Sequence, residues 1–555
     1  MVSLIGPDVF TDVEMFRGYD QNNDTVYSHL LEFKYSDESM NMIKKRLNCP
    51  LHDTNKLNEF STELQHYEHI IDARETELNS LRVFISNSQH LRDSIFAHNP
   101  GDTIIDPDEF VFFKMFVLVK AGLNKSSTSL TLNNAFNILG SPVISILTPI
   151  LYFVLPYLVV RFRLKIMIPF KTYISIIFRS MTSIPIKTRT GITVQIVSSL
   201  VSIGLYLHGV HTTMMLSKNA YRVCVDLVRR IDNFTKYLNR CKLILSLVEP
   251  GFTIPIVVEK WICLNLSVHG EESGSQKSDK FYLKWISLFG SKLVLFKSHS
   301  IDDFGDFFEK FDMVCSKLSI LHLKRKLNMC YSQFIESPTP TLNIKDGFHI
   351  MIKKPVTNSV KLVGTNLILT GPNAGGKSTF IKSVILNVLF SQTLCIACAS
   401  VCEITPFYFI NSQINIPDSK GVESLFEAEM SRCKYNLEIL KFLKDSKSLI
   451  VMDELFNSTN VVEGISGAYS ILSKHATYDN AMTLITTHYP YLTRVPKYIK
   501  YKMDALVGKE GQIEYMYKLK RGTSSQYIAL DILKNNGFEK EIIDHAKEIQ
   551  NKILV

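Results

Sequence analysis

The chain has 555 residues, a formal net charge of +9 and ten cysteines. This length exceeds what one ordinary hydrophobic core supports and predicts roughly three or four domains. The net charge is compatible with a polyanionic partner or a membrane surface, but it is too small to identify either.

The cysteines and the first residues point to a reducing, intracellular compartment. The C-x-x-C pair Cys395–Cys398 lies in an apolar run and lacks the second pair that completes a zinc site, so we expect buried, reduced thiols. The sequence begins MVSLIGPDVFTDVE, which has neither the cationic start nor the continuous apolar run of a secretory signal.

Residues 1–135 are predicted to form a first helical region, with apolar residues recurring among charges between Thr62 and Phe96. Residues 136–215 form a hydrophobic segment. Ile138–Val160 contains 23 residues and no charge, and Ile192–Val210 contains no Asp, Glu, Lys or Arg. Both runs, within 138–210, approach membrane-spanning length, so the alternatives are a membrane hairpin and a pair of buried helices in a larger helical domain.

The charges around these runs bear on that choice. No Asp or Glu occurs from Phe110 to Val225, whereas Lys and Arg recur there. In a two-span hairpin the basic connection would lie across the membrane from a cytosolic domain, against the positive-inside tendency. Pro142, Pro149 and Pro156 also disfavour a simple spanning helix. An in-plane or re-entrant arrangement beside anionic headgroups removes the conflict.

Residues 216–340 return to a helical, mixed-charge pattern, interrupted by the polar stretch Gly270–Lys280, which we interpret as a flexible loop. From residue 341 to residue 555, short strands and glycines, followed by alternating strands and helices, predict an α/β domain. The predicted fold is therefore multidomain, with helical N-terminal and middle regions, a hydrophobic helical insert that is a candidate for membrane association, and a C-terminal α/β domain.

The C-terminal domain contains a phosphate-binding loop. The sequence GPNAGGKST at 371–379 fits the pattern G-x-x-x-x-G-K-S and lies between the apolar strand Leu367–Leu369 and a helical pattern that ends near Leu394. In such a loop backbone N–H groups cradle phosphate oxygens, the lysine reaches the β and γ phosphates, and the serine hydroxyl ligates Mg²⁺. We therefore expect a nucleoside triphosphate and Mg²⁺ to bind here. The predicted nucleotide-binding residues are Gly371, Pro372, Asn373, Ala374, Gly375, Gly376, Lys377, Ser378 and Thr379, of which Ser378 also binds the metal.

Two further strands end in polar residues. Ser448–Met452 is an apolar run followed by Asp453 and Glu454. We expect Asp453 to hold Mg²⁺ through water and Glu454 to polarise the attacking water, although adjacent acids also occur at ordinary helix N-termini. The next strand, Thr483–Thr487, brings His488 to its carboxyl end, where it could hydrogen-bond the γ-phosphate or the attacking water.

A fourth segment, Glu423–Met430, is by itself a helix start capped by Ser424. Together, GPNAGGKST, SLFEAEM, SLIVMDE and TLITTHYPYLT resemble, in order and approximate spacing, the ATPase domain of the MutS family, the ABC-type P-loop ATPases of DNA mismatch repair. The tail after Tyr517 resembles the closing strand and helix-turn-helix segment of that family, so the resemblance covers about residues 341–550.

The resemblance implies Mg²⁺-dependent ATP hydrolysis and double-stranded DNA as a partner. It also implies a homodimer, or a heterodimer with another MutS-like chain. In such a dimer Ser424 meets the γ-phosphate held by Lys377 of the partner subunit, so each ATP site is completed in trans.

The chain departs from the family pattern at two places. Phe456–Asn460 stands where the family has a Gly-Arg-Gly-Thr-Ser loop, and the mismatch-reading N-terminal domain is not recognisable. The leading hypothesis is an ATP-hydrolysing, DNA-binding protein of mismatch repair or related DNA maintenance. The alternatives are a membrane-attached MutS-like ATPase scaffold that does not read mismatches, and a nucleotide-dependent structural protein with weak turnover.

Overall fold

The computed structural model describes residues 3–18, 24–95, 112, 116–120, 122–182, 189–266, 290–414, 425–444, 446–507, 513–524, 526, 529–535 and 537–554. The chain divides into two compact units. Unit 1 combines Met1–Ser86 with Asp312–Val555, and unit 2 is Asn87–Phe311. The four predicted segments, divided after residues 135, 215 and 340, stay a prediction. The polar stretch Gly270–Lys280 lies outside the described residues.

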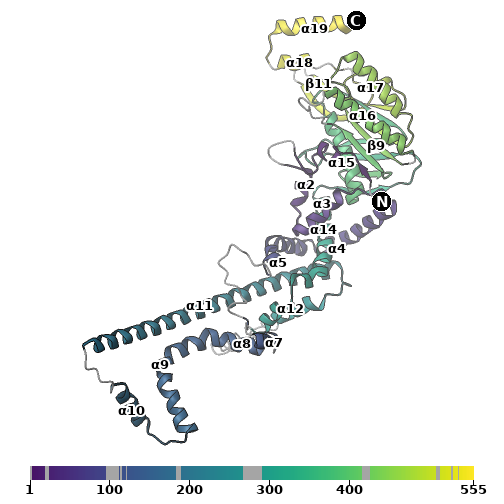
Figure 1. Ribbon diagram of the computed structural model, residues 1–555. Coiled ribbons are helices and arrows are strands. Elements are labelled where there is room, and N and C mark those ends of the chain that lie inside the picture. The colour runs from purple at the N-terminus through teal and green to yellow at the C-terminus, as the bar shows by residue number, and fades with distance from the viewer. Residues whose placement is uncertain are drawn as a thin grey trace. The chain divides into compact units, whose positions relative to one another are not determined.

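The helices and strands confirm a helical N-terminal half and a C-terminal α/β region (Figure 1). The strands are β1 Leu4–Ile5, β2 Cys330–Phe334, β3 Thr341–Gly347, β4 Asn358–Val363, β5 Asn366–Thr370, β6 Ile396–Ala397, β7 Val401–Ile404, β8 Phe409–Gln413, β9 Ser448–Asp453, β10 Ala481–Thr487, β11 Tyr498–Val507 and β12 Ile513–Arg521. The α-helices are α1 Val9–Asp12, α2 Val26–Leu31, α3 Asp37–Leu47, α4 Thr54–Ser88, α5 His90–Ser94, α7 Phe116–Lys120, α8 Ser127–Ala135, α9 Ser141–Leu158, α10 Phe170–Thr182, α11 Arg189–Val248, α12 Ile256–Leu266, α14 Gly305–Lys326, α15 Lys377–Leu394, α16 Leu425–Phe442, α17 Val461–His475, α18 Ala529–Asn535 and α19 Lys540–Leu554. Shorter helical turns are η1 Leu123–Lys125, η2 Phe136–Gly140, η3 Val159–Arg163, η4 Ile301–Phe304 and η5 Pro490–Arg494.

Unit 1 is built on two sheets. The seven-stranded sheet has the order β1-β8-β9-β10-β5-β11-β12, and the five-stranded sheet has the order β4-β3-β7-β2-β6. In the first sheet β12 is antiparallel to β11, and the other neighbouring strands are parallel. The central strands β5, β9 and β10 are buried at almost every position. This matches their continuous apolar sequences, because parallel strands are covered on both faces.

The register of these parallel strands brings three chain segments to one edge of the sheet. Asp453 of β9 lies opposite Thr486 of β10, and Thr487 of β10 lies opposite Thr370 of β5. The phosphate loop follows Thr370 and His488 follows Thr487. The predicted loop, acid pair and histidine therefore meet at the carboxyl ends of adjacent strands, where open α/β sheets bind ligands.

Helix α15 packs between the two sheets, against β9 and β10 of one and β3, β6 and β7 of the other. Fifteen of its 18 residues are buried. On the other face of the seven-stranded sheet, Leu440 of α16 and Leu472 of α17 join a core that includes Ile450 and Ile485. The site at the strand ends is thus held by a sheet with helices on both faces.

The N-terminal residues complete the seven-stranded sheet from a distant part of the sequence. Strand β1 pairs in parallel with β8. The backbone N–H of Leu4 donates to the Tyr408 carbonyl at 2.6 Å, and that of Gly6 donates to the Ile410 carbonyl at 2.8 Å. Residues 4–6 are therefore an edge strand of the α/β domain.

Buried side chains fix this strand in place. Gln392, near the end of α15, donates to Ser3 Oγ at 3.1 Å. Asp12 is 1% exposed, and its Oδ2 accepts from Ser412 Oγ at 2.7 Å and from the Ile414 N–H at 3.1 Å. Ile414 lines the cavity beside the phosphate loop, so the N-terminal segment reaches the end of β8 next to the candidate site.

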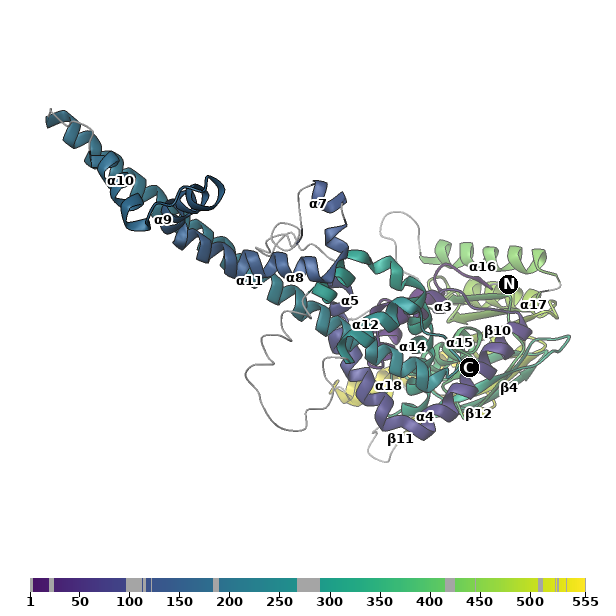
Figure 2. The ribbon, with the colours of Figure 1, turned by 90° about the horizontal axis from the view of Figure 1, so that it is seen from below.

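Unit 2 is helical in its described residues. The C-terminal part of α11 forms an aromatic core with α12 and η4, in which the Trp261 ring lies 5.3 Å from Phe234 and 5.6 Å from Phe304. Helices α8 and the start of α9 lie beside α11 (Figures 1 and 2). Tyr206 Oη of α11 donates to the Ile146 carbonyl of α9 at 2.9 Å.

Among the described residues, one helical stretch, Ser127–Arg163, is long enough to cross a membrane and contains an 18-residue apolar window. Length and composition alone do not distinguish a membrane span from a core helix of a soluble protein. A core helix is mostly buried, whereas 6% of this apolar window is buried. The second predicted run, Ile192–Val210, lies within α11.

The contacts of Asp12 generate a prediction for stability. Asp12→Ala leaves the buried Ser412 hydroxyl and Ile414 N–H without their acceptor, so we expect a loss of about 1–3 kcal/mol in the free energy of unfolding. Urea unfolding of the full chain measures it. Asp479→Ala is the matched control, because Asp479 is 80% exposed and pairs with Lys497 at the surface. Its expected effect is within about 0.5 kcal/mol, and equal effects of the two substitutions would show that the Asp12 contacts add nothing.

Candidate nucleotide-binding site

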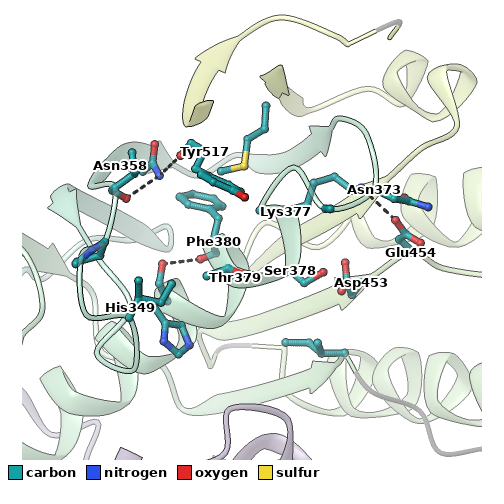
Figure 3. A pocket seen from close by; sticks show the side chains of 18 of the residues that line it. His349, Asn358, Asn373, Lys377, Ser378, Thr379, Phe380, Asp453, Glu454 and Tyr517 are labelled. Carbon is teal, nitrogen blue, oxygen red and sulfur yellow. Dashed lines mark hydrogen bonds and ion pairs between the residues drawn. The ribbon is translucent and has the colours of Figure 1, made fainter. Parts of the chain in front are cut away.

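The phosphate loop connects β5 to α15 and has the backbone of an anion-binding turn (Figure 3). Ala374 and Gly376 have φ angles of 64° and 91°, in the left-handed region. A Cβ at Gly376 would lie 2.9 Å from Cδ1 of Tyr517, so both backbone angle and space require glycine there. The N–H groups at the start of α15 provide the donors and the positive end of the helix dipole that bind phosphate.

Lys377 is the best-buried charge of the site. Its Nζ donates to the carbonyls of Gly371 and Pro372, each at 3.1 Å, and lies 3.2 Å from Glu454 Oε1. The side chain is 5% exposed. A buried ammonium is tolerated only when it is paired and hydrogen-bonded, and these three oxygens meet that need.

The first acid of the predicted pair, Asp453, lies beside Ser378. Its carboxylate is hydrogen-bonded by the hydroxyls of Ser378 and Thr486. Burial raises the pKa of Asp453, and these hydrogen bonds oppose the rise. A serine hydroxyl next to a buried carboxylate is the kind of oxygen pair through which proteins bind Mg²⁺ together with a nucleotide.

The second acid, Glu454, is held by three side chains. Besides Lys377, Asn457 Nδ2 donates to Glu454 Oε2 at 2.8 Å, and His488 Nδ1 lies 3.8 Å from the same oxygen. His488 and then Lys377 lower the pKa of Glu454 to about 2, against the opposing effect of burial. The residue therefore carries a negative charge at neutral pH and can accept a hydrogen bond from water.

These groups surround a cavity of about 810 Å³ (Figure 3). From the predicted set, the residues that line it are Asn373, Ala374, Gly376, Lys377, Ser378, Thr379, Asp453 and Glu454. Gly371 and Pro372 contribute the carbonyls that hold Lys377. Gly375 lies in the same turn, where its N–H donates to the Pro372 carbonyl at 3.1 Å. His488 contacts Glu454 and is not a lining residue, and Ser424 lies outside the described residues.

The far end of the cavity is lined by side chains that the sequence did not single out. His349, Phe380 and Tyr517 lie there, on three different segments of unit 1, and Phe348, the neighbour of His349, also lines the cavity. Aromatic and apolar walls beside a phosphate loop suit a nucleobase. No local motif marks these residues, because they converge only through the packing of the two sheets.

A third carboxylate, Glu429 of α16, also lines the cavity. It accepts a hydrogen bond from Ser458 Oγ at 3.2 Å, and burial raises its pKa. Glu429 belongs to the SLFEAEM segment, whose family resemblance was the one available signal. The contact joins α16 to the loop after the acid pair.

That loop has its own fixed geometry. Phe456 has a φ of 59°, a left-handed value that favours glycine, at the position where the family pattern has the first glycine of its loop. The side chain is buried, 5.3 Å from the Phe426 ring. A Cβ at Gly464 would lie 2.6 Å from the Phe456 carbonyl, so α17 can approach only because it carries glycine there. Packing of the phenyl ring offsets the backbone strain.

The strand–loop–helix turn, the buried lysine and the acid pair at the end of a neighbouring strand define a P-loop ATPase domain. Comparison with known proteins narrows the class. Residues 367–554, about a third of the chain, match the family model for MutS domain V, an ABC-type ATPase domain, so this part of the chain is similar to that domain.

Individual relatives agree. The chain is 32% identical over 234 residues to DNA mismatch repair protein MSH3 of Vanderwaltozyma polyspora. The matched region covers 40% of this chain and 22% of that protein. It is 32% identical over 230 residues to DNA mismatch repair protein MutS of Caldicellulosiruptor bescii, covering 38% and 26%. It is 26% identical over 328 residues to Msh3 of Dictyostelium discoideum, covering 54% and 22%. The similarity thus spans about a quarter or less of each relative.

The depressed pKa of Glu454 predicts a pH dependence of stability. Since the folded-state pKa of about 2 lies below the ordinary value of 4.5, the ionised form stabilises the fold fully above about pH 4.5. This contribution, on the order of 3 kcal/mol, disappears as the pH falls towards 2. Unfolding of wild type and Glu454→Gln at several pH values should show a difference that shrinks in acid. Glu463→Gln on the exposed start of α17 is the control, and a pH-independent difference for Glu454→Gln would contradict the prediction.

Proposed function

We propose that this protein is an intracellular, MutS-like, Mg²⁺-dependent ATPase that works as a dimer with composite ATP sites and acts on double-stranded DNA, in mismatch repair or related DNA maintenance. The observation that carries the ATPase proposal is the contact of Lys377 with Glu454 in the wall of a cavity that Ser378 and Asp453 also line. The proposals of DNA binding and of a dimer rest on the match of residues 367–554 to MutS domain V.

The residues fit ATP and Mg²⁺. The loop N–H groups and Lys377 would bind the phosphates, Ser378 and Asp453 would hold the metal, and the wall around Phe380 and Tyr517 would receive the base. Bound Mg²⁺ would neutralise phosphate charge and polarise the transferred group. The hydrolytic step attaches water to the terminal phosphorus and releases ADP and phosphate.

Three side chains, those of Lys377, Asn457 and His488, contact Glu454 and set its role in hydrolysis. In the structure Lys377 shares its charge between Glu454 and two carbonyls. When Lys377 donates to phosphate oxygens instead, the Glu454 carboxylate becomes free to orient and polarise the attacking water. Asn457 and His488 keep that carboxylate in position. Nucleotide binding therefore frees Glu454 to act as the general base, because Lys377 exchanges the carboxylate for phosphate oxygens.

Glu454→Gln tests this role. The amide keeps the shape and the contact with Asn457 but does not accept a proton, so ATP should bind while turnover falls by about 10²–10⁴-fold. Radiolabelled ATP filter binding and phosphate release measure the two effects. Glu463→Gln on α17 should leave both unchanged. Undiminished turnover in Glu454→Gln would remove Glu454 from the mechanism.

The composite site is tested by mixing two inactive chains. Lys377→Ala should abolish nucleotide binding at its own loop, and Ser424→Arg should block the surface offered to the partner. Each alone is expected to have almost no turnover, whereas the mixture should regain about a quarter of wild-type turnover, because half of the randomly formed dimers contain one intact composite site of two. Lys382→Ala, on the same helix but paired with Glu14, controls for loss of a lysine. A mixture without recovery would argue against sites completed in trans.

A second candidate function is a membrane-attached MutS-like ATPase scaffold that does not read mismatches. The exposure of the apolar window in Ser127–Arg163 favours this candidate. The same ATPase domain could serve DNA maintenance or a membrane-attached scaffold. Binding of matched and mismatched duplexes separates the two candidates: a preference for mismatches supports the first, and equal or absent binding supports the second.

A further inference from the structure

The most exposed apolar surface of the described residues lies in unit 2. We define the apolar arm as residues 138–182 and 196–216, which contain α9, η3, α10 and the first part of α11. Apolar side chains of the arm face outward on both long helices, among them Ile150 at 59%, Leu155 at 58%, Leu200 at 63% and Leu205 at 67% exposure. Helices that are apolar all round are found in protein cores or in membranes, and exposed apolar patches of this kind mark interaction sites.

The dimensions of the arm match a bilayer. Ile138–Val160 has 23 uncharged residues, which would span about 34 Å as one straight helix, against a hydrocarbon thickness of about 30 Å. Figure 1 shows α9, which contains Pro149 and Pro156, bending so that its C-terminal part turns away from α11. A hydrogen bond nevertheless joins α11 to the turn before α9, where Ser217 Oγ donates to the Ile138 carbonyl at 2.6 Å.

Hydroxyl groups on both long helices of the arm donate to carbonyls one turn earlier in the same helix. Thr148 Oγ1 donates to the Ile144 carbonyl at 2.8 Å, and Ser202 Oγ donates to the Ser198 carbonyl at 2.8 Å. Such back-bonding is common in helices, but in hydrocarbon it is required, because no water is present to accept the hydroxyl.

The turn of the arm has the chemistry of a membrane interface. Arg161, Arg163 and Lys165 follow the apolar run at once, and no Asp or Glu occurs from Phe110 to Val225. The Tyr157 ring lies 5.0 Å from Phe170 and 5.2 Å from Tyr173, and Arg161 donates to Tyr157 Oη at 2.7 Å. Aromatic rings and basic side chains together are typical of the headgroup region, and the uncompensated positive charge complements anionic lipid.

We propose that the apolar arm inserts into an anionic lipid bilayer, with α9 and the first part of α11 in the hydrocarbon and η3 and α10 at the headgroups. This inference goes beyond the ATPase and does not depend on it. Duplex DNA would neutralise the basic turn but would leave the apolar helices in water. A second copy of the chain would cover the apolar helices but would bring two acid-free basic turns together.

Flotation of the purified full chain with vesicles tests the proposal. Vesicles of phosphatidylcholine alone are compared with vesicles that also contain phosphatidylserine. We expect the wild type to float with the anionic vesicles. Ile150→Asp combined with Leu200→Asp should reduce partitioning on the order of a hundredfold, because a charge at the centre of a membrane helix is strongly disfavoured. Val83→Asp on α4, where Val83 is 54% exposed, is the matched control and should float like the wild type.

A second variant tests the charge. Arg163→Gln combined with Lys165→Gln should weaken binding to the anionic vesicles on the order of tenfold and leave binding to neutral vesicles unchanged. ATP turnover is measured for every variant and is expected to stay at the wild-type level, so a failure of the ATPase proposal is seen independently of flotation.

Three outcomes would overturn the proposal. The wild type could remain in the aqueous fraction with both vesicle types. The two Asp substitutions could abolish self-association in gel filtration without changing flotation, which would make the arm a contact between copies. The two Gln substitutions could weaken binding to duplex DNA without changing flotation, which would make the turn a DNA surface.

Discussion

The rest of the candidate site depends on the compensation of one buried positive charge. The Lys377 ammonium lies at the start of a helix packed between two sheets, and it is compensated by two carbonyl oxygens of the phosphate loop and a carboxylate oxygen of Glu454, directly after β9. Removing a partner from a buried charge is far more costly than removing a surface pair. The position of Glu454, and with it the end of β9, is therefore fixed by the same interaction that prepares the loop for phosphate.

Contacts around the acid pair extend this constraint to α16. Ser458 joins Glu429 of α16 to the loop that begins at Glu454, and Phe456 anchors the same loop in the core. In the composite site that we propose, α16 follows the segment that meets the partner's nucleotide. One short loop thus connects Glu454, the general base in the mechanism that we propose, to the element through which we propose that a partner is sensed.

Sequence analysis predicted the parts of the site whose signal is local. The loop at Gly371–Thr379 and the acids Asp453 and Glu454 are encoded by contiguous motifs, so spacing and flanking apolar runs were sufficient. Glu429 and the aromatic wall of the cavity at Phe348 depend on packing between segments far apart in the chain, which no local pattern contains. Hydropathy likewise identified the run Ile138–Val160, but only the packing of unit 2 shows that those side chains face outward.

The pairing of β1 with β8 has a consequence for the order in which the protein can assemble during synthesis. Residues 4–6 are translated some four hundred residues before their partners at 408–410. All of unit 2 is made in between and contains its own aromatic core. The helical unit can therefore fold before β1 has a partner, and closure of the seven-stranded sheet is a late, non-local event that depends on residues 4–6 remaining unpaired until then.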